Sequence, residues 1–213
     1  MARPKTDANE IRSRMIEEAE RLLIESSGRR LVLSDVAART GLSQSYAHRF
    51  FPTKADLIRA LASRWFEAVE AECERIARSE APAQERLRTM ILATLRMKRA
   101  RFDHDPALFL AYLELARDHM DLVRAHAADL SAHLSAVLSE IVPAHAVPAA
   151  TALVEDATLL FRTPATIAAH RDRATDERAH AVIDALLPRL AAMCGAPYPS
   201  RHQTSGRNPI QSP

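Results

Sequence analysis

Apolar side chains recur every three or four residues along most of this chain, which is the spacing of one face of an α-helix. No convincing run alternates apolar and polar residues between turn signals, as a half-buried β-strand would require. The pattern therefore predicts an all-α protein. The first helix is expected over about residues 8–26, and its buried stripe is formed by Ile11, Met15, Ala19, Leu22 and Leu23.

Two short helices are expected next, separated by a glycine. The first begins after Ser34 as its N-cap and ends before Gly41, and the second begins after Ser43 and runs through Phe51, where Pro52 stops it. Gly41 supplies the left-handed backbone that a tight turn between helices requires. Residues 34–57 thus have the pattern of a helix-turn-helix, whose second helix fits the major groove of DNA.

The rest of the chain predicts a larger helical bundle. Helices are expected over about 54–79, from Pro82, from Pro106, and over about 119–142, 147–170 and 176–193, with Pro164 and Pro188 kinking or breaking the last two. Residues from 196 onward have no periodicity and are expected to form a disordered tail. The prediction is a helix-turn-helix domain over 1–52, a helical bundle over 53–195 and a tail over 196–213.

Composition excludes several function classes. The four glycines lie at 28, 41, 195 and 206, too far apart for a P-loop, a dinucleotide-binding turn or a nucleophile elbow. Cys73 and Cys194 form no C-x-x-C pair, no metal site or cofactor is expected, and no segment is apolar enough to span a membrane, so a cytoplasmic protein is predicted. Residues 1–64 hold 12 Lys and Arg against 8 Asp and Glu, a basic surplus that suits a polyanionic partner.

The proposed recognition helix has side chains suited to DNA. Ala47 and either Phe50 or Phe51 must face the core, which turns the polar residues of this helix outward. Gln bonds adenine, Arg bonds guanine or phosphate, and Ser and Tyr commonly contact phosphate. From these residues alone, the alternative to DNA contact is a polar helix face that contacts only solvent. The outward residues are Gln44, Ser45, Tyr46, His48 and Arg49.

The segment also resembles the DNA-binding domain of the TetR family of transcription regulators. The matching residues are Val36-Ala37, Gly41-Leu42-Ser43, Phe51, Pro52-Thr53-Lys54 and Leu57. The resemblance implies that the N-terminal domain binds double-stranded DNA, with Lys54 holding a phosphate at a helix N-terminus. The chain departs from the family where His48 stands in place of a tyrosine that contacts the DNA backbone, while Tyr46 lies two residues earlier. The basic arm Arg3-Pro4-Lys5 is a further candidate for a DNA contact, with a disordered terminus as the alternative. The residues expected to contact DNA are Ser34, Ser43, Gln44, Ser45, Tyr46, His48, Arg49 and Lys54.

The resemblance further implies that residues 53–195 bind a small-molecule effector and form a homodimer, which predicts a near-palindromic operator. The candidate dimer interface is Leu153, Leu159, Leu160, Ile183, Leu186, Leu187 and Leu190, with ordinary core packing as an equal alternative. The candidate effector pocket, which core packing explains equally well, is Met97, Arg101, Phe102, Phe109, Tyr112, Leu113, Met120 and Phe161. His119, His126 and His133 recur every seven residues and are expected to form a solvated or interface-edge stripe rather than a metal or pH sensor.

These observations predict a ligand-responsive DNA-binding repressor and not an enzyme. The alternative is a helical module that uses its helix-turn-helix for protein contacts, and a small helical enzyme comes third. The repressor and the protein-contact module differ in their expected salt dependence, because DNA binding releases counterions and weakens steeply as salt rises.

Overall fold

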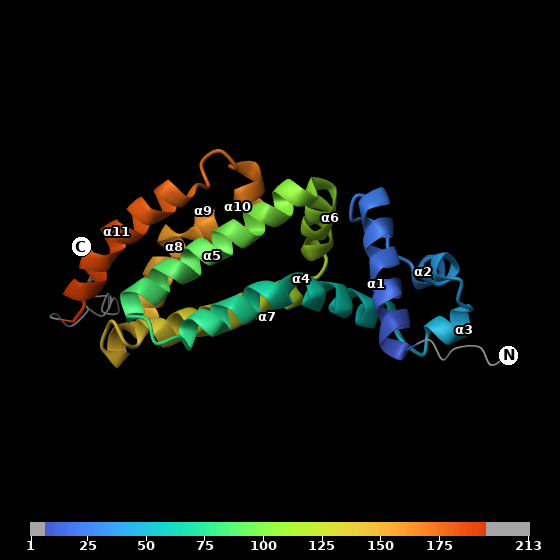
Figure 1. Ribbon diagram of the computed structural model, residues 1–213, viewed down its shortest axis with the longest axis horizontal. Coiled ribbons are helices and arrows are strands. Elements are labelled where there is room, and N and C mark those ends of the chain that lie inside the picture. Colours follow the sequence, from blue (N-terminus) through green and yellow to red (C-terminus); the bar gives the residue numbers. More distant parts are fainter. Residues whose placement is uncertain (1–6, 195–213) are drawn as a thin grey trace, which may run out of the picture.

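A computed structural model describes residues 7–194, and within that range the chain is all-helical, without strands. The predicted all-α class is confirmed. The basic arm at Arg3 to Lys5 and the predicted tail over 196–213 lie outside the described residues. Figure 1 shows α1, α2 and α3 grouped at one end of an elongated molecule and α11 at the other end.

The N-terminal end contains α1 (Ala8–Glu25), α2 (Leu33–Thr40) and α3 (Gln44–Ala47). The Asp7 side chain caps α1 by accepting the N–H of Asn9 at 3.1 Å. After α1, Gly28 turns the chain with a left-handed φ of 79° and donates its N–H to the carbonyl of Leu23 at 2.8 Å. The three helices pack around side chains with no exposed surface, which include Met15, Leu23, Val36, Ala47 and Phe51.

Two details of this end differ from the sequence prediction. Ser34 is not the N-cap of α2, because the helix begins at Leu33 and its N-cap is Val32. Leu31 and Leu33 are both buried, so core packing rather than a hydroxyl cap sets this start. The predicted recognition helix is also shorter as an α-helix, since after Ala47 the chain continues in turns to Phe51. These turns keep helix-like backbone bonds, such as Phe51 N–H to the carbonyl of Ala47 at 3.1 Å.

Four longer helices follow close to their predicted positions. They are α4 (Lys54–Ala77), α5 (Ala83–His104), α6 (Pro106–Arg117) and α7 (Met120–Leu138). Thr53 and Asp56 form a capping box at the start of α4, with the Asp56 carboxylate accepting the N–H of Thr53 at 3.0 Å. This helix runs from the α1–α3 end into the bundle, so it belongs to both parts of the molecule (Figure 1).

The C-terminal part is more divided than predicted. It contains η1 (Ala144–Ala146), α8 (Val147–Ala157), α9 (Leu159–Arg162), α10 (Pro164–Ala169) and α11 (Asp176–Ala192). Pro164 breaks its predicted helix because Thr163, the residue before it, is extended with ψ 123°. Pro188 does not end its helix and lies inside α11. Only α11 of the two predicted long C-terminal helices is continuous.

The side chains form two cores. One joins α5, α7, α8 and α11 around residues such as Leu95, Leu134 and Ile183. The other fills the N-terminal end and also takes Leu57, Ile58 and Leu61 from α4 with Ala111, Tyr112 and Leu115 from α6. The N-terminal core thus includes side chains from beyond residue 52.

Candidate DNA-binding surface and ligand cavity

The turn between α2 and α3 has the geometry of a helix-turn-helix. Gly41 ends α2 with a left-handed φ of 71°. Thr40 is buried, and its hydroxyl donates to the carbonyls of Val36 and Ala37 at 2.9 and 3.0 Å. Ala37 is 2% exposed, and its small side chain lets the two short helices cross closely. Local backbone chemistry therefore fixes the angle at which α3 leaves α2.

The polar side chains of α3 face solvent as the sequence predicts. Ala47 and Phe51 are completely buried, and Phe50 is half-buried. Tyr46 is 38% exposed, and its ring packs edge-on against Phe50 with centroids 5.3 Å apart. The Arg49 guanidinium carbon lies over the Tyr46 ring, 5.6 Å from its centroid. The tyrosine and the arginine thus form one exposed unit. The other exposed polar residues of this segment are Ser43, Gln44, Ser45, His48 and Arg49.

Ser34 and Ser43 are partly engaged within the protein. Ser34 is half-buried, with its Oγ 3.4 Å from a carboxylate oxygen of Asp35. Ser43 caps α3 by accepting the N–H of Tyr46 at 3.2 Å, and its Oγ also lies 3.3 Å from that of Ser45. Ser34 is thus the least accessible of the predicted DNA-contacting residues.

His48 has a constrained tautomer. Its Nδ1 lies 3.0 Å from the carbonyl of Pro52, which can only accept, so Nδ1 carries a proton. In the neutral ring Nε2 is then an acceptor, and it can donate to a phosphate only in the imidazolium form. The histidine therefore replaces a tyrosine hydroxyl as a phosphate donor only when it is protonated.

Lys54 is exposed on the first residue of α4, where unpaired backbone N–H groups favour anions. The neighbouring Asp56 carboxylate takes up the N–H of Thr53, and hydrogen bonds from Thr53 hold the pKa of Asp56 below its usual value. Lys54 itself forms no ion pair in the part of the chain that the structure describes. Its ammonium group is therefore available to an external anion.

A cavity of about 630 Å³ lies in the bundle between α4, α5, α6, α7 and the α9–α10 connection. This volume is in the range of small-molecule sites. Five of the eight predicted pocket residues line it: Arg101, Phe109, Tyr112, Leu113 and Met120. The other three do not, because Phe161 is buried in the bundle core, Met97 packs against that core and Phe102 packs edge-on against Phe109.

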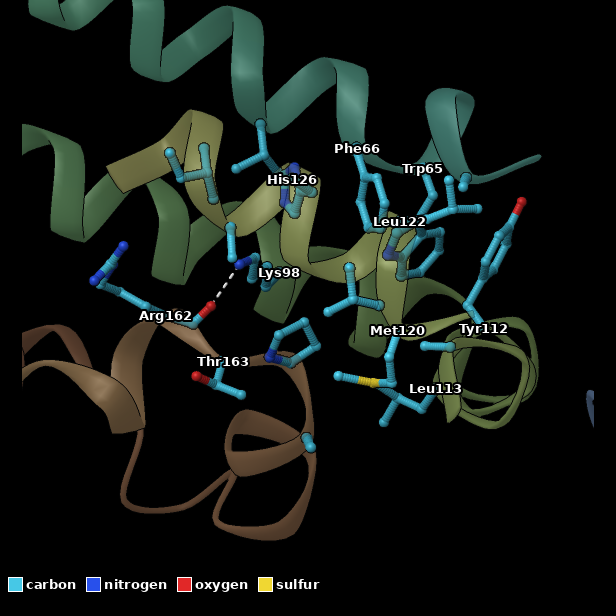
Figure 2. Close-up of a pocket in the computed structure, with 18 of the residues that line it drawn as sticks. Trp65, Phe66, Lys98, Tyr112, Leu113, Met120, Leu122, His126, Arg162 and Thr163 are labelled. Atoms are coloured by element: carbon cyan, nitrogen blue, oxygen red, sulfur yellow. Dashed lines mark hydrogen bonds between the residues drawn. The ribbon is translucent and has the colours of Figure 1, made fainter. Parts of the chain in front are cut away.

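Aromatic side chains that the sequence prediction missed form one wall of the cavity (Figure 2). Trp65 stacks on Tyr112 with ring centroids 4.2 Å apart, and Phe66 stacks on His126 at 4.0 Å. His126 also bonds Glu70 and lines the cavity, so at this histidine the solvated form of the expected stripe is wrong, and the interface-edge form stays a prediction. Burial lowers the pKa of His126, although Glu70 acts in the opposite direction. Trp65 has helical spacing with the buried Leu57, Leu61 and Val69 of α4, but periodicity in the sequence could not reveal that it faces a cavity.

Two cations face this mostly apolar space from α5. Lys98 is 7% exposed, and Figure 2 shows its ammonium directed at the main-chain carbonyl of Arg162, to which it donates. Arg101 lies over the Trp65 ring at 4.7 Å and donates to the Trp65 carbonyl. Burial lowers the pKa of Lys98 to about 8 and lowers that of Arg101 as well. Lys98 continues the α5 stripe of Leu87, Ile91 and Leu95, which is the signal that the prediction overlooked.

Most residues of the predicted dimer interface are packed inside the single chain and not on its surface. Ile183, Leu186 and Leu190 are buried in the bundle core, whereas Leu159 is 54% exposed. Leu153, Leu160 and Leu187 are partly buried against the same core. Core packing therefore accounts for the buried members of the set. Over residues 7–194, no helix is both long and apolar enough to cross a lipid bilayer.

Comparison with known proteins supports the resemblance seen in the sequence. Residues 83–183 match the family model described as the tetracyclin repressor-like C-terminal domain. The chain is also similar to the HTH-type transcriptional repressor LfrR of Mycolicibacterium smegmatis, at 32% identity over 82 residues. That similarity covers 38% of this chain and 40% of the repressor, so the chain spans less than half of its relative's length.

Two solved structures resemble the chain over most of its length. One is Mycobacterium smegmatis AmtR, with 21% identity, coverage of 89% of this chain and 88% of that chain, and a TM-score of 0.47. The other is LfrR from Mycobacterium smegmatis in complex with proflavine, with 23% identity, coverage of 88% and 98%, and a TM-score of 0.42. The family model thus matches the chain from α5 into α11, and the similarity to the curated repressor is also partial, so both likenesses concern only part of the chain.

Proposed function

We propose that this protein is a ligand-responsive transcription repressor of the cytoplasm, which binds a near-palindromic operator as a homodimer. The observation that carries the proposal is the exposed set Gln44, Tyr46 and Arg49, held outward by the buried Ala47 and Phe51. These side chains match base edges and phosphates in a major groove that admits one helix.

The charges at this end support a polyanionic partner. Arg49 and Lys54 form no ion pair with any residue between 7 and 194, so neither charge is neutralised there. Arg49 is held over Tyr46 at 5.6 Å, which orders the guanidinium without discharging it. A phosphate or a guanine edge supplies the missing acceptors, and arginine can bind either in a bidentate manner.

The cavity is connected to the DNA-binding end through two elements. Lys54 and Trp65 lie on the same helix, about 16 Å apart at 1.5 Å per residue. Tyr112 lines the cavity and donates its hydroxyl to Glu20 of α1 at 2.9 Å. A ligand between these groups shifts the population of α4 orientations and thereby the separation of the two recognition helices in a dimer.

Selection from a random double-stranded DNA pool tests the DNA-binding part. We expect enriched sequences with two-fold symmetry and half-sites about one DNA turn apart, near 34 Å. Affinity for the enriched site, measured by fluorescence anisotropy, should fall steeply as salt is raised. If no sequence is enriched and binding to other proteins persists, the helix-turn-helix is a protein-interaction module.

Sedimentation equilibrium tests the dimer separately. Ala152 of α8 and Ala181 and Ala185 of α11 are exposed, and small side chains of this kind allow close helix packing between subunits. We expect a species of twice the chain mass of 23.6 kDa at micromolar concentration. A monomer at every concentration would contradict the homodimer.

A further inference from the structure

Lys98 is a buried cation without a counter-ion. Within residues 7–194 it forms no ion pair, and its single hydrogen bond goes to the main-chain carbonyl of Arg162. An ammonium group has three N–H donors, so two remain for another acceptor. The side chain borders a cavity whose other walls are largely apolar or aromatic.

Such a charge is costly in a protein interior unless an anion compensates it. Burial lowers the pKa of Lys98 to about 8, and the nearby charges of Arg162 and Arg101 act in the same direction. A pKa near 8 still leaves most of this ammonium protonated at pH 7. The cavity therefore holds a positive charge that a bound anion would stabilise.

The other charged groups of the lining add to this preference. Four lining residues are cationic, Lys98, Arg101, Arg117 and Arg162, against the two anionic residues Glu155 and Asp156. Arg117 pairs with Glu114 at 2.7 Å and Arg162 with Glu155 at 3.6 Å, which leaves Lys98 and Arg101 without carboxylate partners among residues 7–194. Asp156 is exposed, so solvent screens its charge.

We propose that the cavity binds a small carboxylate on a flat apolar body. The carboxylate accepts hydrogen bonds from Nζ of Lys98, and the body lies against the aromatic wall that contains Trp65 and Phe66. This inference rests on the proposed function in treating the cavity as the effector site. Ligand binding is nevertheless measured without DNA, so the two proposals fail independently.

A matched series of probes tests the charge preference. Naphthalene-2-carboxylate, naphthalene-2-carboxamide and naphthalen-2-ylmethylammonium share one flat body and differ in charge. Trp65 is the only tryptophan of the chain and lines the cavity, so its fluorescence reports binding directly. At pH 7 we expect the carboxylate to bind the full-length protein roughly tenfold or more tighter than the amide, because hydrogen bonds to charged groups are the stronger class. The ammonium should bind weakest.

The variant Lys98→Met separates charge from shape, since methionine keeps an unbranched side chain of similar length. We expect it to bind carboxylate and amide with similar affinity, while retaining the affinity of the native protein for the amide. The control Arg96→Met removes a cation from the same helix that is exposed and paired with Asp176 at 2.6 Å, and it should retain the carboxylate preference.

The pH dependence gives a second readout that a structural defect would not produce. The groups facing Lys98 are Cys73 of α4, His126 of α7, Arg101 of its own helix and Arg162 of α9. Burial lowers the pKa of His126 and raises that of Cys73. Both shifts favour the neutral forms of the imidazole and the thiol where Lys98 titrates, so the change in charge comes from Lys98. Carboxylate affinity should fall as Lys98 loses its proton above pH 8 in the native protein, and this fall should be absent in Lys98→Met.

Three results would overturn the inference. They are equal or tighter binding of the amide or the ammonium, a carboxylate preference that survives in Lys98→Met, and no binding of the carboxylate at all. None of these results bears on DNA recognition, because the selection from a random DNA pool tests that proposal without a ligand.

Discussion

The two ends of this molecule both present cations, but in opposite environments. At the α2–α3 end, Arg49 and Lys54 stand in water, where an unpaired charge costs little and remains available to a polyanion. In the bundle, Lys98 is enclosed beside an apolar cavity, where the same charge is a liability without a partner. Exposed cations suit a large, screened ligand such as DNA, whereas an enclosed one selects a single small anion.

The largest expected effect concerns the contact between the two ends of the molecule, where the turn at Gly28 packs on α6. Gly28→Ala should cost about 2 to 4 kcal/mol of unfolding free energy, measured by urea denaturation. The new Cβ would lie 2.3 Å from the carbonyl oxygen of Ala111 and 2.7 Å from Cβ of Glu114, both on α6, at a residue with φ of 79°. The substitution therefore pushes the α1 turn away from the helix that lines the cavity.

Gly41→Ala is the matched control for that prediction. Gly41 has a similar φ of 71°, but a Cβ there would meet no atom of the described residues within 4 Å. It should cost only about 1 kcal/mol, the strain of a left-handed alanine. Equal costs at the two glycines would show that the packing of α6 on the turn contributes nothing.

At the exposed end, Arg49→Ala or Tyr46→Ala should weaken binding to the selected operator by roughly 1 to 3 kcal/mol and leave thermal unfolding nearly unchanged. The reason is that both side chains lie in solvent and contact mainly each other and Phe50. Anisotropy titration of labelled operator measures the effect. Arg75→Ala, an exposed arginine paired with Glu72 at 2.7 Å on α4, is the control. Unchanged affinity in both α3 variants would remove these residues from the DNA interface.

In the bundle, Lys98→Met should raise the unfolding free energy at pH 7 by about 2 kcal/mol. The pKa of Lys98 is lowered to about 8 in the folded state, so the unfolded chain binds more protons at this site between pH 8 and the ordinary lysine value. Native stability at this site is therefore lowest below pH 8 and increases as the pH rises through that window. The advantage of the variant should shrink accordingly by pH 10.

Denaturation of both proteins at pH 7 and pH 10 measures that difference. A constant gap between native protein and variant would show that the charge of Lys98 is not the cause. A destabilised variant would mean that the hydrogen bond to the Arg162 carbonyl outweighs the cost of burying the ammonium group.

The smallest expected effect tests the link between the cavity and the α1–α3 end. Tyr112→Phe removes the hydroxyl that donates to Glu20 at 2.9 Å and should cost about 1 kcal/mol of unfolding free energy. Tyr46→Phe is the control, because that hydroxyl makes no hydrogen bond within residues 7–194. Similar stability of the two variants in urea denaturation would remove the Tyr112 bond from the proposed connection.

Much of this structure was predictable because its determinants are local. The prolines at 82 and 106, the capping residues Ser43 and Thr53, and the glycines at 28 and 41 act within one turn of helix, and each sits where the helices begin or end. The prediction failed at Ser34, where packing with distant side chains determined the outcome, while Pro188 did not break its helix. Leu31 and Leu33 draw the start of α2 into the core, and Pro188 is accommodated inside α11.

The residues that line the cavity also fall into a predicted group and a group that only the structure revealed. The predicted lining residues come from α5, α6 and α7, whereas Trp65 and Phe66 of α4 and Lys98 of α5 were missed and meet the others only in the folded bundle. Periodicity identifies the side of a helix that is buried. It cannot distinguish a face packed against another helix from one that borders a hollow.

The sequence by itself determined the all-helical class, the helix-turn-helix and the outward polar face of α3, because each depends on neighbours a few residues apart. Only the tertiary structure decided which cations are enclosed, that α6 joins the cavity to α1, and that Lys98 lacks a carboxylate partner in the described chain. Those properties depend on distances between residues far apart in sequence, and such distances are set by how the helices pack.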